Sequence, residues 1–165
     1  MPSPVKEFAD DWIWIGYWQS LCLQFYRDRV TSEGIRAAHD SRLRMKDRIG
    51  RTPDSFAVIV TGGKMPKVGD EERKLIKELQ HALSNTDLSS AQVIEGTGFV
   101  ASTTRAILAG INMFSRSHTK VFDSVGAAAL WLSPRTNVSA PDLVLAVEQA
   151  RADWASVTGR PQSRT

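Results

Sequence analysis

Apolar positions alternate in two neighbouring stretches near the start of the chain. The stretch 11–17, DWIWIGY, alternates two tryptophans with two isoleucines, and the stretch 20–27, SLCLQFYR, alternates Leu21, Leu23 and Phe25 with more polar residues. Alternation of this kind is typical of β-strands, and the close spacing favours an antiparallel hairpin. We therefore predict two paired strands at the start of the fold.

A helical pattern follows this predicted hairpin. Thr31 or Ser32 is suited to cap a helix that runs to about Ile49, and Gly50 is suited to end it. The predicted apolar side contains Ile35, Ala38, Met45 and Ile49. The same helix carries the basic residues Arg36, Arg42, Arg44, Lys46 and Arg48. These charges spread around the helix, and Arg42 even falls near the apolar side, so we interpret them as a solvated face rather than an anion-binding stripe.

Strands and helices then alternate to the end of the chain. Strands are predicted over 55–60, 91–95 and 120–123. Helices are predicted from near Asp70 with Leu75, Ile76, Leu79 and Leu83 buried, from Phe99 to Arg116, from Ser124 to Ser133–Pro134, and from near Pro141 with Leu143, Val147, Ala150, Trp154 and Val157 buried. This order predicts an α/β fold: about five strands in a mostly parallel sheet with right-handed crossovers, an N-terminal antiparallel hairpin, and helices packed on the sheet.

Length and composition indicate one domain. The chain has 165 residues, of which 42% are hydrophobic, and this is enough to form one core. We expect a single domain over 1–165, with a core over about 11–133, a C-terminal helix over about 140–157 and a loose tail over 159–165. The first few residues are also expected to be loose.

Charge and residue usage exclude several classes of function. The net charge of +3 is too small to favour nucleic acid as a partner. The single cysteine, Cys22, rules out an internal disulfide, and three scattered histidines give no metal-ligand spacing. No apolar stretch approaches the ~20 residues that span a bilayer. We expect a cytoplasmic protein with no metal, no cofactor and no membrane insertion.

The stretch 91–116, AQVIEGTGFVASTTRAILAGINMFSR, is the strongest candidate for a site. It is predicted to form a strand, a tight turn at Gly96 and Gly98, and a helix. Along that helix Ser102, Arg105, Asn112 and Arg116 are spaced three or four residues apart or in multiples of that spacing, and we expect them to face outward. A polar stripe beside a glycine turn favours a surface that binds a protein partner.

With this element order, the segment Phe99-Val100-Ala101-Ser102-Thr103-Thr104 resembles the motif of STAS domains, which include SpoIIAA-like anti-sigma-factor antagonists. In that family a central strand leads to a motif like Phe-Ile-Asp-Ser-Ser-Gly whose first serine accepts phosphate. The resemblance implies a non-enzymatic regulatory or scaffolding domain with Ser102 as phosphoacceptor and Thr103 beside it. Ala101 and Thr104 stand where the family motif has aspartate and glycine.

Other functions remain open. Gly96, Gly98 and Ala101 also match a relaxed dinucleotide fingerprint, G-x-G-x-x-A, with Asp123 at the next strand end as a ribose-binding acid. Together with Thr61 and Lys64 in the loop after the strand 55–60, these residues define an alternative nucleotide or small-ligand site.

A third alternative is a homo-oligomeric structural protein that assembles through the N-terminal tryptophans or the last helix. For catalysis, Ser102 lacks the G-x-S-x-G elbow and no histidine can be assigned as its base, so the sequence does not indicate an enzyme.

Overall fold

The computed structural model describes residues 2–64, 66–83, 88–112 and 118–159. Within them the main sheet has six strands in the order β1-β2-β3-β5-β7-β8. These strands are β1 (Val5–Ala9), β2 (Ile13–Trp18), β3 (Leu21–Arg27), β5 (Asp54–Val60), β7 (Ser89–Glu95) and β8 (His118–Phe122). The first three pair antiparallel, whereas β3, β5, β7 and β8 are parallel neighbours. The α/β architecture, the mostly parallel sheet and the N-terminal hairpin are confirmed.

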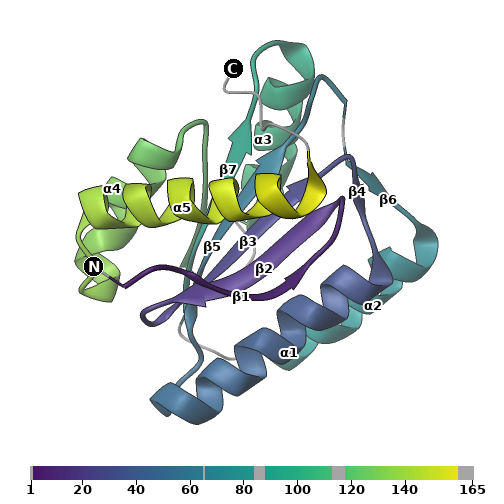
Figure 1. Ribbon diagram of the computed structural model, residues 1–165. Coiled ribbons are helices and arrows are strands. Elements are labelled where there is room, and N and C mark those ends of the chain that lie inside the picture. Colours follow the sequence, from purple (N-terminus) through teal and green to yellow (C-terminus); the bar gives the residue numbers. More distant parts are fainter. Residues whose placement is uncertain (1, 65, 84–87, 113–117, 160–165) are drawn as a thin grey trace.

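Further elements connect and cover this sheet. A separate parallel pair is formed by β4 (Arg29–Val30) and β6 (Lys67–Val68). The helices are α1 (Ser32–Ile49), α2 (Asp70–Leu83), α3 (Phe99–Asn112), α4 (Val125–Thr136) and α5 (Ala140–Thr158). Figure 1 shows α5 crossing one face of the sheet, with α1 and α2 on the opposite side.

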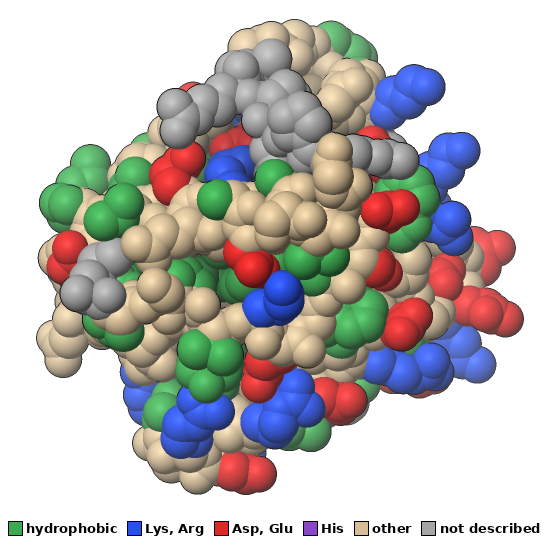
Figure 2. All heavy atoms as spheres, viewed as in Figure 1, with side chains coloured by type: hydrophobic (Ala, Val, Ile, Leu, Met, Phe, Trp, Pro, Cys, Tyr) green, Lys and Arg blue, Asp and Glu red, His purple; other side chains and the backbone are tan. Residues whose placement is uncertain are grey.

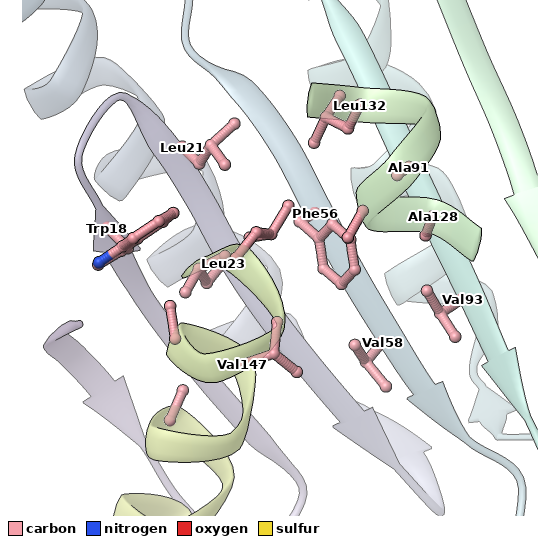
Figure 3. Close-up of a cluster of buried hydrophobic side chains, with 14 of the residues drawn as sticks. Trp18, Leu21, Leu23, Phe56, Val58, Ala91, Val93, Ala128, Leu132 and Val147 are labelled. Atoms are coloured by element: carbon pink, nitrogen blue, oxygen red, sulfur yellow. The ribbon is translucent and has the colours of Figure 1, made fainter. Parts of the chain in front are cut away.

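The larger hydrophobic core lies between the sheet and the helices α4 and α5. Trp14, Leu23, Phe56 and Val58 from the strands meet side chains of these helices, and all four are buried. Figure 3 shows strand side chains such as Leu23, Phe56 and Val93 pointing towards Leu132 of α4 and Val147 of α5. On the opposite face, a smaller cluster joins Ile13 and Ile15 of β2 to Ala38 of α1. The sheet is therefore covered on both faces.

Surface chemistry also differs between the two helical layers. Figure 2 shows charged side chains gathered over α1 and α2 along the bottom and right of the view, whereas hydrophobic side chains are exposed at the α4 end. Leu130 of α4 has a relative exposure of 70%.

Local signals account for the boundaries of α1. The Thr31 hydroxyl accepts a 3.1 Å hydrogen bond from the Gly34 amide at the start, and Gly50 ends the helix in the left-handed region with φ of 75°. The Gly50 amide donates to the Lys46 carbonyl oxygen at 2.9 Å. The predicted bounds of this helix are confirmed.

Three expectations about the elements are wrong. Residues Val5–Ala9 form an edge strand rather than a loose start, because the Trp18 indole donates to the Pro2 carbonyl and the ladder continues from β2. Helix α4 continues through Pro134 to Thr136 and ends at Asn137, whose φ of 56° lies in the left-handed region. Proline still removes one helical hydrogen bond there. Val157, expected to be buried, is 46% exposed.

Candidate functional site

The two faces of the central strands have different chemistry. Towards α4 and α5, β3 and β5 present Leu23, Phe25, Phe56 and Val58, and all four are fully buried. Towards α1 and α2 the alternate positions on β3, β5 and β7 are mainly polar or small, namely Cys22, Gln24, Tyr26, Ser55, Ala57, Ser90 and Gln92. Ile59 and Ile94 are the large apolar residues on this face. Central strands covered by helices on both faces are usually apolar on both, and this face departs from that pattern.

A cavity of about 340 Å³ lies over this polar face. Its sheet side includes Gln24, Tyr26, Ser55, Ala57, Ile59, Ser90 and Gln92. Its helical walls come from Ile35, Ala38, His39 and Arg42 of α1, Ile76 and Leu79 of α2, and Thr104 of α3. Val30, Pro66 and Val68, in and beside the β4–β6 pair, complete the lining. This volume lies at the lower end of the range for small-ligand sites, about 300–1,000 Å³.

Strand register gathers the polar groups on the floor. Gln24 is opposite Ala57, which is opposite Gln92, so two amides flank one small residue in a row across three strands. In the next row, Ser55 and Ser90 join their hydroxyls by a 2.7 Å hydrogen bond. The small side chain of Ala57 therefore leaves the space between the two amides open.

The Gln24 amide is only partly satisfied by the protein. Tyr26 donates a 2.6 Å hydrogen bond from its hydroxyl to Gln24 Oε1. Gln24 Nε2 is buried and has no hydrogen-bond partner among the described residues, and the residue as a whole is 5% exposed. Burial raises the pKa of Tyr26 to about 12, while the positive charge of Arg42 opposes that rise. Tyr26 is therefore neutral at ordinary pH and keeps its proton for Gln24.

Arg42 and His39 place two more polar groups at the cavity. They lie one turn apart on α1 and both border the cavity. Arg42 Nε and His39 Nδ1 are buried, and neither finds a hydrogen-bond partner in the described parts of the chain. An unpaired buried polar atom costs about 1–3 kcal/mol, and more if it is charged. The folded protein therefore has polar groups here that form no hydrogen bond within the described chain.

The turn predicted as a site has a well-defined structure. Gly96 has φ of 125°, and a Cβ there would lie 2.7 Å from Thr61 Oγ1, while Gly98 has φ of 92° with open space around it. Thr61 is buried, and its hydroxyl donates to the Glu95 carbonyl oxygen at 3.0 Å. The structure thus joins Thr61 to the Gly96 turn, whereas Lys64 is exposed in the following loop.

Arg105 is bound to this turn rather than projecting freely. Its Nη1 donates to the carbonyl oxygens of Ile94 at 3.0 Å and Gly96 at 3.4 Å, and its Nη2 lies 3.4 Å from Ser102 Oγ. Ser102 is exposed in the first turn of α3, and Thr103 is half-buried. The side chain of Asn112 and all of Arg116 lie outside the described residues.

The acidic groups near the turn are separated. Glu95 forms a two-point ion pair with Arg151 of α5, and both side chains are largely buried. Asp123 follows β8 and is exposed. The described chain has no strand beyond β8 at this end of the sheet. Glu95 is therefore engaged in holding α5 against the sheet.

The N-terminal tryptophans have mostly structural positions. Trp14 and Trp18 are each 1% exposed in the main core, and the Trp14 indole donates to Asp153 Oδ2 at 2.8 Å. Trp154 of the last helix is also fully buried. These three rings are unavailable as an oligomer surface.

Metal binding and membrane insertion can each be judged from the described residues. Within their ranges, no group of three or more His, Cys, Asp or Glu side chains is placed to hold a metal ion. None of the described helices combines the length and the apolar character needed to cross a membrane.

Comparisons of this chain with protein-family models, with curated proteins and with solved structures give no match. The resemblance to STAS domains therefore stays a prediction, and the site must be interpreted from its own geometry. Sequence reasoning missed the cavity. The available signals were Arg42 near the apolar side of its helix and the glutamines at inward positions of two strands.

Proposed function

We propose that this chain is a small-molecule-binding domain whose ligand occupies the cavity between the sheet and the helices α1 and α2. The observation that carries the proposal is a 340 Å³ cavity lined by Gln24, His39 and Arg42, each with a buried polar atom that has no protein partner within the described chain. Ligand sites are mostly apolar cavities with a few convergent polar groups, and this cavity has that composition.

Stability alone gives no reason for this arrangement. The opposite face of the same strands has a dense core of large apolar side chains, among them Phe25 and Phe56. A chain selected only for stability gains by filling a cavity and by removing unpaired polar atoms. Retaining both costs folding free energy, and a bound ligand offsets that cost because it stabilises only the folded state.

The test uses N-phenyl-1-naphthylamine, a neutral apolar probe whose fluorescence rises in apolar surroundings. Ala57→Leu places a larger side chain between Gln24 and Gln92 on the floor of the cavity. Ala127→Leu, on an exposed position of α4, is the matched control. We expect saturable binding at one site in the wild type and the control, and at least a tenfold loss in Ala57→Leu. Equal binding by all three proteins, or no saturable binding, contradicts the proposal.

We propose as a second candidate the protein-partner surface at the start of α3, in the manner of a STAS-like regulatory domain. The observation in its favour is Phe99, which is 85% exposed beside Ser102 and the glycine turn. Support for the STAS-like assignment comes from the order of strands and helices and from the segment that begins at Phe99. Single exposed apolar residues are common, so this surface has less support than the cavity.

The second candidate is tested by purifying the tagged protein from its native host and measuring the affinity of each isolated co-purifying protein. Phe99→Ser should weaken a genuine partner at least tenfold, and Leu130→Ser, at another exposed apolar position, is the control. Phosphate on Ser102 or Thr103, found by mass spectrometry, would support switching. Identical affinities for both variants and the wild type exclude this surface.

A further inference from the structure

We propose that the cavity ligand is a monocarboxylate with a compact apolar body, and that its carboxylate pairs with Arg42. This inference rests on the proposed ligand-binding function and adds the chemical class of the ligand.

The charge of the cavity comes from Arg42. None of the described residues that line it is an aspartate or a glutamate, and Arg42 carries the one formal positive charge in that lining. No ion pair joins Arg42 to any residue that the structure describes. Arg42 is half-buried, its Nε has no partner in the described chain, and an anion in the cavity would neutralise its charge. The site therefore favours a ligand with one negative charge.

Two glutamates beside α1 and at the start of α2 have partners of their own. Glu7 forms a two-point ion pair with Arg44, at 3.2 and 3.1 Å, on the strand next to α1. Glu72 at the start of α2 accepts a 2.7 Å hydrogen bond from the Ser32 hydroxyl. Neither glutamate borders the cavity. The lining leaves Arg42 for a ligand.

Arg42 of α1 and Gln24 of β3 both border the cavity. The positive charge of Arg42 opposes the rise in the pKa of Cys22 and of Tyr26, the residues two positions before and after Gln24 on β3. Gln24 lies between these two residues on the same face, with Nε2 as an unused donor. In this proposal the ligand carboxylate pairs with the guanidinium of Arg42, and the amide of Gln24 borders the same cavity.

The rest of the lining is mainly aliphatic. Ile35, Ile59, Val68, Ile76 and Leu79 come from four different elements and surround the remaining volume. A ring system or a short branched chain fits this space, and burying it supplies roughly 25 cal/mol per Å² of apolar area. Polyphosphates and dinucleotides do not fit, because one cation cannot neutralise several negative charges.

The experiment compares two ligands of nearly identical shape. 1-Naphthylacetate and 1-naphthylacetamide differ only in the carboxylate, and each is titrated against bound N-phenyl-1-naphthylamine at constant pH and salt. Wild-type protein should bind the acid about ten- to a hundredfold more tightly than the amide, the range expected of charged hydrogen bonds. Arg42→Met should remove this preference. Arg42→Lys, which keeps the charge, should retain part of it.

The outcomes separate this inference from the function on which it rests. If the neutral probe does not bind at all, the cavity is not a ligand site. If the probe binds but acid and amide bind the wild type equally, the carboxylate assignment is wrong. A preference that persists unchanged in Arg42→Met also overturns it, because the charge would then be recognised elsewhere. The comparison of acid and amide needs no variant, so a poorly folded variant does not block the test.

Discussion

Tyr26 donates a 2.6 Å hydrogen bond to Gln24 Oε1, whereas Gln24 Nε2 has no protein partner among the described residues. The two residues lie two positions apart on β3, and both face α1 and α2. The tyrosine therefore orients the amide, with Oε1 as the bonded atom and Nε2 as the unpaired one. This pair connects the fold to the proposed function, because β3 is a strand of the main sheet and also holds the Gln24 amide beside the cavity.

The coupling between these two residues can be measured. Tyr26→Phe removes the donor and Gln24→Leu removes the acceptor, and each variant should change the free energy of unfolding by about 1 kcal/mol, the usual contribution of a hydrogen bond. In the double variant no polar group of the pair is left unpaired, so the effects should be non-additive by about 0.5 kcal/mol or more. Urea unfolding of all four proteins gives the answer. Strict additivity would show that the two side chains do not interact.

The ion pair between Glu95 and Arg151 should hold α5 to the end of β7. Their side chains are 25% and 13% exposed, so removing one partner leaves a poorly solvated charge. Glu95→Gln should destabilise the protein by roughly 1–3 kcal/mol. The pair Lys6 and Asp153 is about 40% exposed on both sides, and Lys6→Met is the control, with an expected cost below about 1 kcal/mol. Equal costs in the two variants would contradict this ranking.

The two glycines of the β7–α3 turn should respond differently to alanine. Both have positive φ, but only at Gly96 would the new Cβ also approach Thr61 Oγ1, at 2.7 Å. Gly98→Ala should cost about 1–2 kcal/mol from backbone strain alone. Gly96→Ala should cost more, and thermal unfolding with calorimetry would rank them. A larger effect at Gly98 would mean that the Thr61 contact does not restrict the turn.

Stability should fall at alkaline pH. Burial raises the pKa of Cys22 from its usual 9.0 to about 11 and that of Tyr26 from 10.0 to about 12. Both groups are held neutral in the folded protein, so their contribution is complete below the unfolded pKa values and is lost as the pH rises through the folded ones. The window is therefore about pH 9–12. A folded pKa that lies one pH unit above the unfolded pKa corresponds to about 1.4 kcal/mol of stability.

Variants assign this alkaline effect to its groups. In Cys22→Ala the decline between pH 9 and 11 should be shallower than in the wild type, and in Tyr26→Phe the decline between pH 10 and 12 should be shallower. Urea unfolding at each pH measures the slope. Slopes that match the wild type in both variants would show that neither group is responsible.

The sequence predicts the order of elements because the local signals are strong. Thr31 and Gly50 bound α1, and Ser124 caps α4 by accepting from the Ala127 amide. The alternation of Leu21, Leu23 and Phe25 with Gln24 and Tyr26 places each set on its own face of β3. These features depend on neighbours a few residues apart. Periodicity is sufficient to find them.

The cavity depends on contacts that the sequence does not display. Gln24 and Gln92 flank Ala57 only because β3, β5 and β7 adopt this order and register. Within the run SFAVIV, Ser55 and Ala57, which face α1 and α2, alternate with large apolar residues, and the sequence alone does not show that they share a polar face. The helical pattern predicts Arg42 near the apolar side of its helix, but its place in the cavity lining depends on how α1 packs on the sheet.

The exposure of side chains on α3 also depends on tertiary contacts. Phe99 is 85% exposed, while Ala101 and Thr104 are buried. Phe99 follows Gly98, whose positive φ sets the direction in which the helix starts. Arg105, which the sequence predicts to face outward, donates to carbonyl oxygens in the turn of its own chain. The helical period gives the spacing of a face, and tertiary contacts decide which face is covered.

The most direct test of the central claim is a two-dimensional methyl NMR titration of the wild-type protein with 1-naphthylacetate. Two groups of methyl-bearing residues report on the two sides of the sheet. The first group surrounds the cavity and consists of Ile35, Ile59, Ile76 and Leu79. The second group lies in the opposite core and consists of Leu132, Val93 and Val147. The account predicts ring-current shifts that saturate for the first group and leave the second almost unchanged. Shifts confined to the second group, or spread evenly over both, would contradict a ligand site between the sheet and the helices α1 and α2.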